Sequence, residues 1–289
     1  MTLLKVIVLA IVQGLAELLP VSSSAHVVVA EKLMGLDPSS PPMTLLLVML
    51  HTGTMVAVIA YFWREWRAIY FQSAAAFKTF VWLVIVATFF TGVIGEGIVK
   101  VIERTALRDV PHAQIEDLFS HLEFIAPALA AAGILIVIAG LFEKRHPAGG
   151  SGAAQDLNAR RAGVIGAVQG LCLPFRGFSR SGATISTGML LGVAKSRAEA
   201  FSFALAVVLT PPVVAREVMR LMHAAHASGT AELRSVIVLT LLGAAVALLA
   251  GLLALKWLSR WLENGRWYLF GIYCLAAAAA VALLHHAGY

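Results

Sequence analysis

The stretch QGLAELLPVSSSAH, residues 13–26, places a carboxylate, a proline, three consecutive hydroxyls and an imidazole inside an otherwise apolar part of the chain. A second stretch, QGLCLPFRGFSRSGAT at residues 169–184, repeats it in part. When the two are aligned on their glutamines, three further positions agree: Gly14 with Gly170, Leu15 with Leu171, and Ser23 with Ser179. This agreement indicates an internal repeat, so we expect the two halves of the chain to fold alike.

The composition is that of an integral membrane protein. Of 289 residues, 60% are hydrophobic and only 13% are charged, which lies outside the range of soluble domains. The net charge is +6, but the basic residues lie in short loops between apolar runs and form no basic face, so we expect no nucleic-acid partner. The two cysteines, Cys172 and Cys274, each lie in an apolar segment and offer neither a disulfide framework nor a thiolate metal site.

Several segments are long and apolar enough to cross a bilayer, which takes about 20 residues of helix. Six such spans are predicted, at residues 44–62, 80–99, 124–142, 201–221, 236–258 and 267–284. Two further apolar segments, 3–36 and 162–193, are broken near the middle by Pro, Ser and Gly. Each half of these two segments is too short to span.

Irregular backbone inside a bilayer is tolerated only where protein or water covers it. We therefore expect segments 3–36 and 162–193 to form re-entrant helix hairpins whose tips meet near the middle. Each repeat then holds one hairpin and three spanning helices, and this odd number inverts the second repeat. The predicted fold is an all-α integral membrane protein with two inverted-topology repeats in a single membrane domain, 1–289: repeat 1 over about 1–145, a flexible linker over about 146–159, and repeat 2 over about 160–289.

The loop charges give this topology an orientation. One side receives twelve cationic residues: Arg64, Arg67, Lys78, Lys144, Arg145, Arg160, Arg161, Lys195, Arg197, Lys256, Arg260 and Arg266. The other side receives seven: Lys5, Lys32, Lys100, Arg104, Arg108, Arg220 and Arg234. By the positive-inside rule the first side is cytoplasmic, so both termini are predicted to lie outside.

Glu17 is a candidate functional residue because burying a charge in a membrane costs at least a few kcal/mol. It lies one helical turn after Gln13, so the two side chains share a face and could offer oxygen ligands to Mg²⁺ or Ca²⁺. The alternative is that Glu17 forms a salt bridge that only holds the hairpins together.

The serines that follow, Ser22, Ser23 and Ser24, stand just before His26. A hydroxyl nucleophile needs a neighbouring base, and the imidazole could be that base. Serines at the start of a helix are also common capping residues, which is the structural alternative. Because Glu17 and His26 are close in sequence, we favour the catalytic interpretation. His51, in the stretch LHTGT at residues 50–54, either lines the same cavity or is a packing residue.

The stretch GFSRSGAT, residues 177–184, has the parts of a phosphate site: Gly177 for close backbone approach, hydroxyls, and Arg180 at a predicted helix start. Backbone N–H groups at a helix start bind anions, and a guanidinium grips phosphate with two parallel hydrogen bonds. A tight turn of small residues packed between helices is the alternative, but such a turn has no need of Arg180.

Taken together, these motifs resemble the undecaprenyl pyrophosphate phosphatases of the bacitracin-resistance type, over essentially the whole chain. The resemblance rests on QGLAELLPVSSSAH, LHTGT, GFSRSGATIS at residues 177–186 and RAEAFSFALA at residues 197–206. It implies a bacterial inner-membrane enzyme that hydrolyses a polyprenyl diphosphate to the monophosphate, with a divalent cation and a site open to the periplasm. That reaction recycles the lipid carrier of cell-wall synthesis. The implied partners are the lipid substrate and membrane lipids, and a homodimer is left open.

The resemblance also implies roles for individual residues. The acidic motif falls on Gln13 and Glu17 as cation ligands, and the catalytic Ser and His fall on Ser23 and His26, with Arg180 also catalytic. The predicted substrate-binding residues are Ser22, Arg176, Gly177, Ser179, Ser181 and Thr184. Arg176 departs from the family motif, which has Pro at that position.

Two mechanisms follow from these roles, and the sequence does not separate them. Ser23 attacks phosphorus with His26 as base, or His26 activates water directly, while Arg180 neutralises the transferring group. A transporter of a polyprenyl phosphate lipid is the alternative function, because inverted repeats with broken helices suit transport equally well.

Overall fold

The structure is a computed structural model that describes residues 2–37, 40–105, 121–145, 156–225, 230–262 and 266–288. Within these ranges it contains ten α-helices and no strand, so the predicted all-α class is confirmed. The helices are α1 (Leu3–Leu18), α2 (Ser23–Leu33), α3 (Pro41–Ile69), α4 (Ala74–Thr105), α5 (Leu122–Arg145), α6 (Ala159–Cys172), α7 (Arg180–Leu190), α8 (Lys195–Ala225), α9 (Thr230–Leu262) and α10 (Tyr268–His286).

Five helices of the described residues are long and apolar enough to cross a membrane. They are the segments Met43–Ile69, Ala74–Thr105, Leu122–Arg145, Val236–Trp257 and Tyr268–His286, which match five of the six expected spans. The sixth expected span, 201–221, lies in α8, where several side chains fall outside the described part of the chain. Residues 146–155 of the expected linker and Arg108 also lie outside it.

The first helix pair forms a helix–turn–helix hairpin because Pro20 interrupts the helix. Leu19, the residue before the proline, has φ −85° and ψ 148°, the extended backbone that proline imposes on its predecessor. The hairpin closes at its base, where Lys5 Nζ donates to the Met34 carbonyl at 2.7 Å. The start of α1 therefore lies beside the end of α2.

The second helix pair, α6 and α7, closes in the same way. Arg161 Nε donates to the Leu191 carbonyl at 3.2 Å, and Arg161 aligns with Lys5 when Gln169 is placed on Gln13. The turn between the helices contains Pro174 and Gly177, whose φ of +105° suits a residue without a side chain. Both apolar segments that the sequence marked as broken are hairpins.

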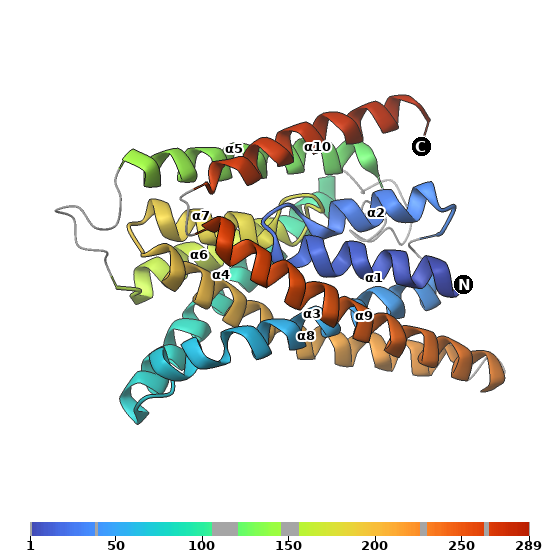
Figure 1. The fold of residues 1–289 in the computed structure, drawn as a ribbon, viewed down its shortest axis with the longest axis horizontal. Helices are drawn as coiled ribbons and strands as arrows, with labels where there is room; N and C mark the ends of the chain where they lie inside the picture. Colours follow the sequence, from blue (N-terminus) through green and yellow to red (C-terminus); the bar gives the residue numbers. More distant parts are fainter. Residues whose placement is uncertain are drawn as a thin grey trace.

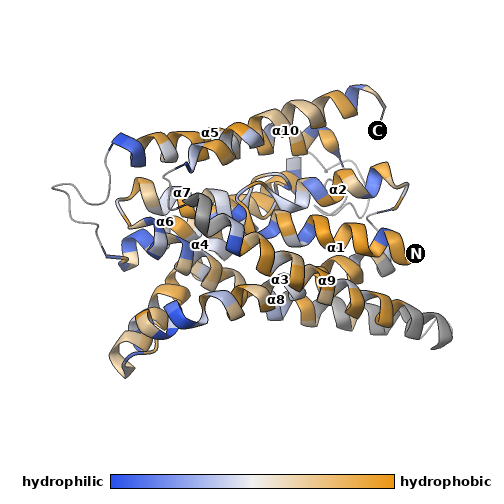
Figure 2. Cartoon of the chain, in the orientation of Figure 1, coloured by the Kyte–Doolittle hydropathy of each residue, from blue (hydrophilic) through white to orange (hydrophobic). Residues whose placement is uncertain are grey.

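The remaining helices enclose the two hairpins. The helix α1 packs against α9 and α6 packs against α4, while α5 and α10 run side by side along one edge (Figure 1). The chain termini lie at the same end of the molecule (Figure 1). Apolar side chains such as Phe89, Leu253 and Leu283 are exposed on the outside, and hydrophilic residues of α5 and α10 lie mainly near the helix ends (Figure 2). This distribution is the one expected for a surface in contact with lipid.

Glycines set how closely the hairpins approach their supporting helices. A Cβ atom on Gly14 of α1 would lie 2.7 Å from the Ala247 carbonyl oxygen of α9. A Cβ atom on Gly170 of α6 would lie 2.8 Å from the Thr91 carbonyl oxygen of α4. Small residues at such crossings allow close backbone packing, which drives helix association in membranes.

We expect Gly170→Ala to lower stability by about 1–3 kcal/mol, because the new methyl group must push backbone apart. The matched control is Gly92→Ala in α4, where a Cβ would meet nothing within 4 Å. Thermal unfolding in detergent checks this, with a lower Tm expected for Gly170→Ala alone. Equal Tm values for the two variants would contradict the proposed packing.

Candidate active site

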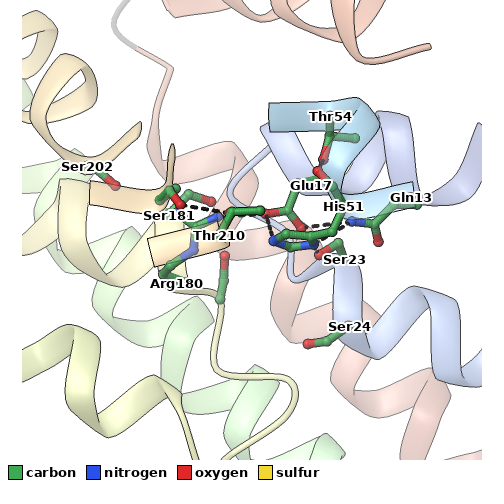
Figure 3. Close-up of polar contacts among 12 residues, drawn as sticks. Gln13, Glu17, Ser23, Ser24, His51, Thr54, Arg180, Ser181, Ser202 and Thr210 are labelled. Carbon is green, nitrogen blue, oxygen red and sulfur yellow. Dashed lines mark hydrogen bonds and ion pairs between the residues drawn. The ribbon is translucent and has the colours of Figure 1, made fainter. Parts of the chain in front are cut away.

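The tips of the two hairpins meet at an ion pair. Arg180 at the start of α7 places Nη2 2.6 Å from Oε1 of Glu17 near the end of α1 (Figure 3). The turn residue Gly177 adds a second link, because its N–H donates to Ser24 Oγ at 3.4 Å. The turn regions of the two helix pairs are therefore in direct contact.

Glu17 is the centre of the polar cluster, and its side chain is only 4% exposed. Oε1 faces Arg180 and His51, whose Nε2 lies 3.4 Å away. Oε2 accepts a hydrogen bond from Ser23 Oγ and another from Gln13 Nε2 at 3.2 Å. A buried carboxylate is costly unless it is paired and hydrogen-bonded, and four partners satisfy this one.

The first of the three serines, Ser22, has a strained backbone. Ser22 has φ 67° and is the single residue other than glycine with positive φ in the described residues. It caps α2, since its Oγ accepts from the Ala25 N–H at 3.4 Å. The turn places Ser23 at the first position of α2, where its hydroxyl points back toward Glu17 (Figure 3).

Arg180 stands at the first position of α7, and Ser179 caps that helix by accepting from the Gly182 N–H at 3.2 Å. Nη2 of Arg180 contacts Glu17. Nη1 of Arg180 is buried and has no hydrogen-bond partner among the described residues. The first N–H groups of a helix also lack partners within the helix. The unpartnered Nη1 therefore belongs to a residue at a helix start, and a guanidinium at a helix N-terminus is an arrangement that binds anions.

These side chains line a small cavity of about 220 Å³ between the hairpins. Its polar lining residues are Glu17, Ser22, Ser23, Ser24, His51, Gln169, Arg176, Ser179, Arg180 and Ser181. Both charge signs and several hydroxyls are thus gathered in a space large enough for a phosphate group.

His26 lies at the edge of a second space. Its Nδ1 is 2.8 Å from the Ser22 carbonyl, and its Nε2 is 2.7 Å from the hydroxyl of Tyr273 in α10. The two rings stack with centroids 5.6 Å apart. Both line a groove of about 630 Å³ whose other walls are almost entirely apolar, from α1, α9 and α10.

A family model described as bacitracin resistance protein BacA matches residues 6–280. The chain belongs to the BacA family. Its relative named undecaprenyl-diphosphatase 2 from Acinetobacter baylyi is 55% identical over 287 residues, which cover 98% of each chain. Proteins named undecaprenyl-diphosphatase from Gluconacetobacter diazotrophicus and Rhodopirellula baltica are 34% and 30% identical, each over at least 98% of both chains. The resemblance seen in the motifs is therefore confirmed over the whole length.

The structure of this BacA family chain brings most of the predicted site residues together. Gln13 and Glu17 contact each other, and the predicted residues that line the cavity are Glu17, Ser22, Ser23, Arg176, Ser179, Arg180 and Ser181. Thr184 lies outside the cavity, fully buried, and contacts the Arg180 carbonyl at 2.8 Å and Ser202 Oγ at 2.6 Å. It supports the backbone behind Arg180.

His26 differs from the sequence-based expectation, whereas for His51 one of the two open interpretations is confirmed. The hydroxyl of Ser23 donates to Glu17, and the contacts described for His26 are to Ser22 and Tyr273. His51, for which the sequence left two interpretations open, lines the cavity and contacts Glu17 and Gln13. The sequence signal for His51 was the polar motif LHTGT inside an apolar span. That motif did not show which face of α3 meets α1.

The left-handed backbone of Ser22 predicts an unusual stability order. Ser22→Gly loses a weak cap but accepts positive φ freely, so its stability should stay within a few tenths of a kcal/mol of the parent. Ser22→Ala loses the cap and keeps the strain, so we expect a loss of about 1–2 kcal/mol. Thermal unfolding of the two variants checks this, and an alanine variant as stable as the glycine variant would contradict it.

Proposed function

We propose that this chain is a membrane undecaprenyl-diphosphatase, which hydrolyses undecaprenyl diphosphate to undecaprenyl phosphate and inorganic phosphate. The observation that carries the proposal is the buried Nη1 of Arg180, which has no hydrogen-bond partner among the described residues and belongs to a side chain that lines the same cavity as Ser23. The names of the relatives support hydrolysis of this lipid and do not favour the transporter alternative.

We propose that the fold consists of two inverted repeats with re-entrant hairpins. The crossings of Gly14 and Gly170 support this. Gly14 approaches Ala247 and Gly251, and Gly170 approaches Thr91 and Gly95. The alignment that places Gln13 on Gln169 also places Thr91 on Ala247 and Gly95 on Gly251. The hairpin of each repeat therefore packs against the equivalent helix of the other repeat, which is expected of two related repeats. With the loop charges, this topology puts both termini outside and opens the site toward the periplasm.

The terminal phosphoryl group binds in the cavity between the hairpin tips. Arg180 donates from Nη1 to its oxygens, and the N–H groups at the start of α7 add further donors. Phosphoryl transfer depends mainly on positioning and on neutralising charge, and both are supplied by groups already fixed by packing and by Glu17. The bridging oxygen leaves with the lipid monophosphate, which is a stable anion.

Two nucleophiles remain, and the contacts favour Ser23. Its Oγ forms a bond to the terminal phosphorus while the bond to the bridging oxygen breaks, and its proton passes to Glu17 Oε2, to which it already donates. Water then hydrolyses the phosphoserine and releases inorganic phosphate. In the second route His26 takes a proton from water, whose oxygen bonds directly to the terminal phosphorus while the bond to the bridging oxygen breaks and the lipid monophosphate leaves.

A divalent cation, Mg²⁺ or Ca²⁺, is part of the proposal, with Glu17 and Gln13 as its protein ligands. The described residues contain no group of three His, Cys, Asp or Glu side chains that could hold a metal. One carboxylate and one amide fit a cation that takes its other ligands from diphosphate and water, as Mg²⁺ commonly does. The bound cation would neutralise part of the diphosphate charge.

The prenyl tail lies in the apolar groove. Ala16 of α1 lines both the polar cavity and the groove, so a lipid headgroup and its first isoprenyl units can reach the two spaces around one helix. Leu15, Leu19 and Phe270 supply apolar walls. Each buried methylene contributes about 0.8 kcal/mol, so the tail adds affinity without specific polar contacts.

Phosphate release from undecaprenyl diphosphate by the purified, detergent-solubilised protein tests the proposed function. We expect release that a chelator stops and added Mg²⁺ restores. Arg180→Lys should lower kcat about 10²–10³-fold because the forked donor is lost.

The control for Arg180→Lys is Arg104→Lys at the exposed end of α4, which should behave as the parent. Full activity in Arg180→Lys would refute the site assignment. No release by folded parent protein that still binds the lipid saturably would favour the transporter.

Acid quenching with lipid labelled at the terminal phosphate separates the two nucleophiles. We expect labelled protein, because phosphoserine survives acid, and we expect Ser23→Ala to lose both the label and most of the activity. An unlabelled parent protein, with Ser23→Ala still active and His26→Ala inactive, would establish the water route instead.

A further inference from the structure

His51 makes two contacts in the cluster, and each defines one ring nitrogen. Gln13 Nε2 lies 3.2 Å from the Glu17 carboxylate and 3.0 Å from His51 Nδ1. An ionised carboxylate only accepts hydrogen bonds, so the atom of Gln13 that faces it is the amide nitrogen. That amide nitrogen then donates to His51 as well, and Nδ1 is the acceptor.

The other ring nitrogen follows from this. In neutral imidazole one nitrogen accepts and the other carries the proton, so the proton is on Nε2. His51 Nε2 lies 3.4 Å from Glu17 Oε1, the oxygen that also faces Arg180. Figure 3 shows the His51 ring between Gln13 and Glu17. His51 therefore accepts a hydrogen bond from Gln13 through Nδ1, and its Nε2–H lies at ion-pair distance from Glu17, one helical turn away on α1.

The backbone that carries His51 is firmly placed. Its neighbour Leu50 is fully buried, and Gly53 packs so closely on Ala244 of α9 that no side chain would fit there. Within the described contacts of Glu17, His51 is the one partner from α3. The other three come from α1, from the start of α2 and from α7.

We propose that His51 is a positioning residue that acts as a neutral N–H donor, holding the Glu17 carboxylate in the orientation that serves Arg180 and Ser23. Gln13, Ser23 and Arg180 donate hydrogen bonds to the Glu17 carboxylate, and His51 Nε2 lies 3.4 Å from the same oxygen that Arg180 contacts. Removal of His51 leaves Oε1 to Arg180 alone, so the carboxylate is free to rotate toward the guanidinium and away from Ser23. This inference rests on the proposed function for its kinetic test, but not for its spectroscopic test.

The kinetic test compares His51→Ala with His51→Gln. A glutamine has one carbonyl to accept from Gln13 and one amide to donate to Glu17, so it reproduces the pattern of the neutral ring. We expect His51→Ala to lower kcat about 10–100-fold, since displacement of a catalytic group by about 1 Å is costly. KM should change little because Arg180 and the α7 N–H groups remain, and His51→Gln should recover most of kcat.

The matched control is Thr52→Ala. It removes a polar side chain from the next position of α3, where the hydroxyl donates to Val48 of its own helix at 2.8 Å. This variant should keep the parental kcat. A His51→Gln variant as impaired as His51→Ala would show that the imidazole itself does acid–base work, and would overturn the proposal. Parental kcat in His51→Ala would also overturn it.

Nitrogen NMR of the histidine-labelled parent protein needs no activity. The chain has nine histidines, and the His51 signals are identified by their absence in His51→Gln. We expect the Nε2–H tautomer at about pH 8, where a histidine is ordinarily neutral. A Nδ1–H tautomer would refute the donor role. An inactive parent protein that shows the Nε2–H tautomer would refute the proposed function and leave the placement of His51 intact.

Discussion

The ion pair between Glu17 and Arg180 is the contact on which the rest of the site depends. It joins the end of α1 to the start of α7, so one hairpin from each half of the chain contributes one charge. Neither charge is stable alone in this setting, because an unpaired buried charge costs several kcal/mol. Each hairpin therefore completes the other, and the meeting of the tips creates the site.

The two side chains of the ion pair differ in how many of their polar atoms have partners, and this difference leaves a donor for an anion. Both oxygens of Glu17 have partners, whereas Arg180 retains a buried Nη1 without a hydrogen-bond partner among the described residues. An ion pair of purely structural purpose would be expected to satisfy both partners, since a buried unsatisfied donor is costly. Arg180 lines the cavity between the hairpins, where a bound anion would offset that cost.

The two helix breaks were predictable from the sequence because their signals are local. Pro20, Pro174 and Gly177 interrupt helices by their own geometry, and the repeat between Gln13 and Gln169 shows that the interruption occurs twice. The cluster of Glu17, Ser23 and Arg180 was also predictable, because charges and hydroxyls inside apolar segments are few. The contacts of the histidines were not predictable. His26 reaches Tyr273 and His51 reaches Gln13 across different helices, and no local pattern gives the rotation of α3 or α10 about its axis.

The helix α1 has one polar face and one apolar face because of the spacing of its residues. Gln13 and Glu17 are four residues apart and share the face that meets His51 and Arg180, while Val12, Leu15 and Leu19 lie on the face that lines the apolar groove. A single helix thus separates a polar space from an apolar one, and Ala16 borders both. An amphipathic ligand can occupy both spaces at once only if its polar end is small and sits at the end of a flexible apolar chain. A lipid diphosphate has that form, so the geometry of α1 supports the proposed substrate class.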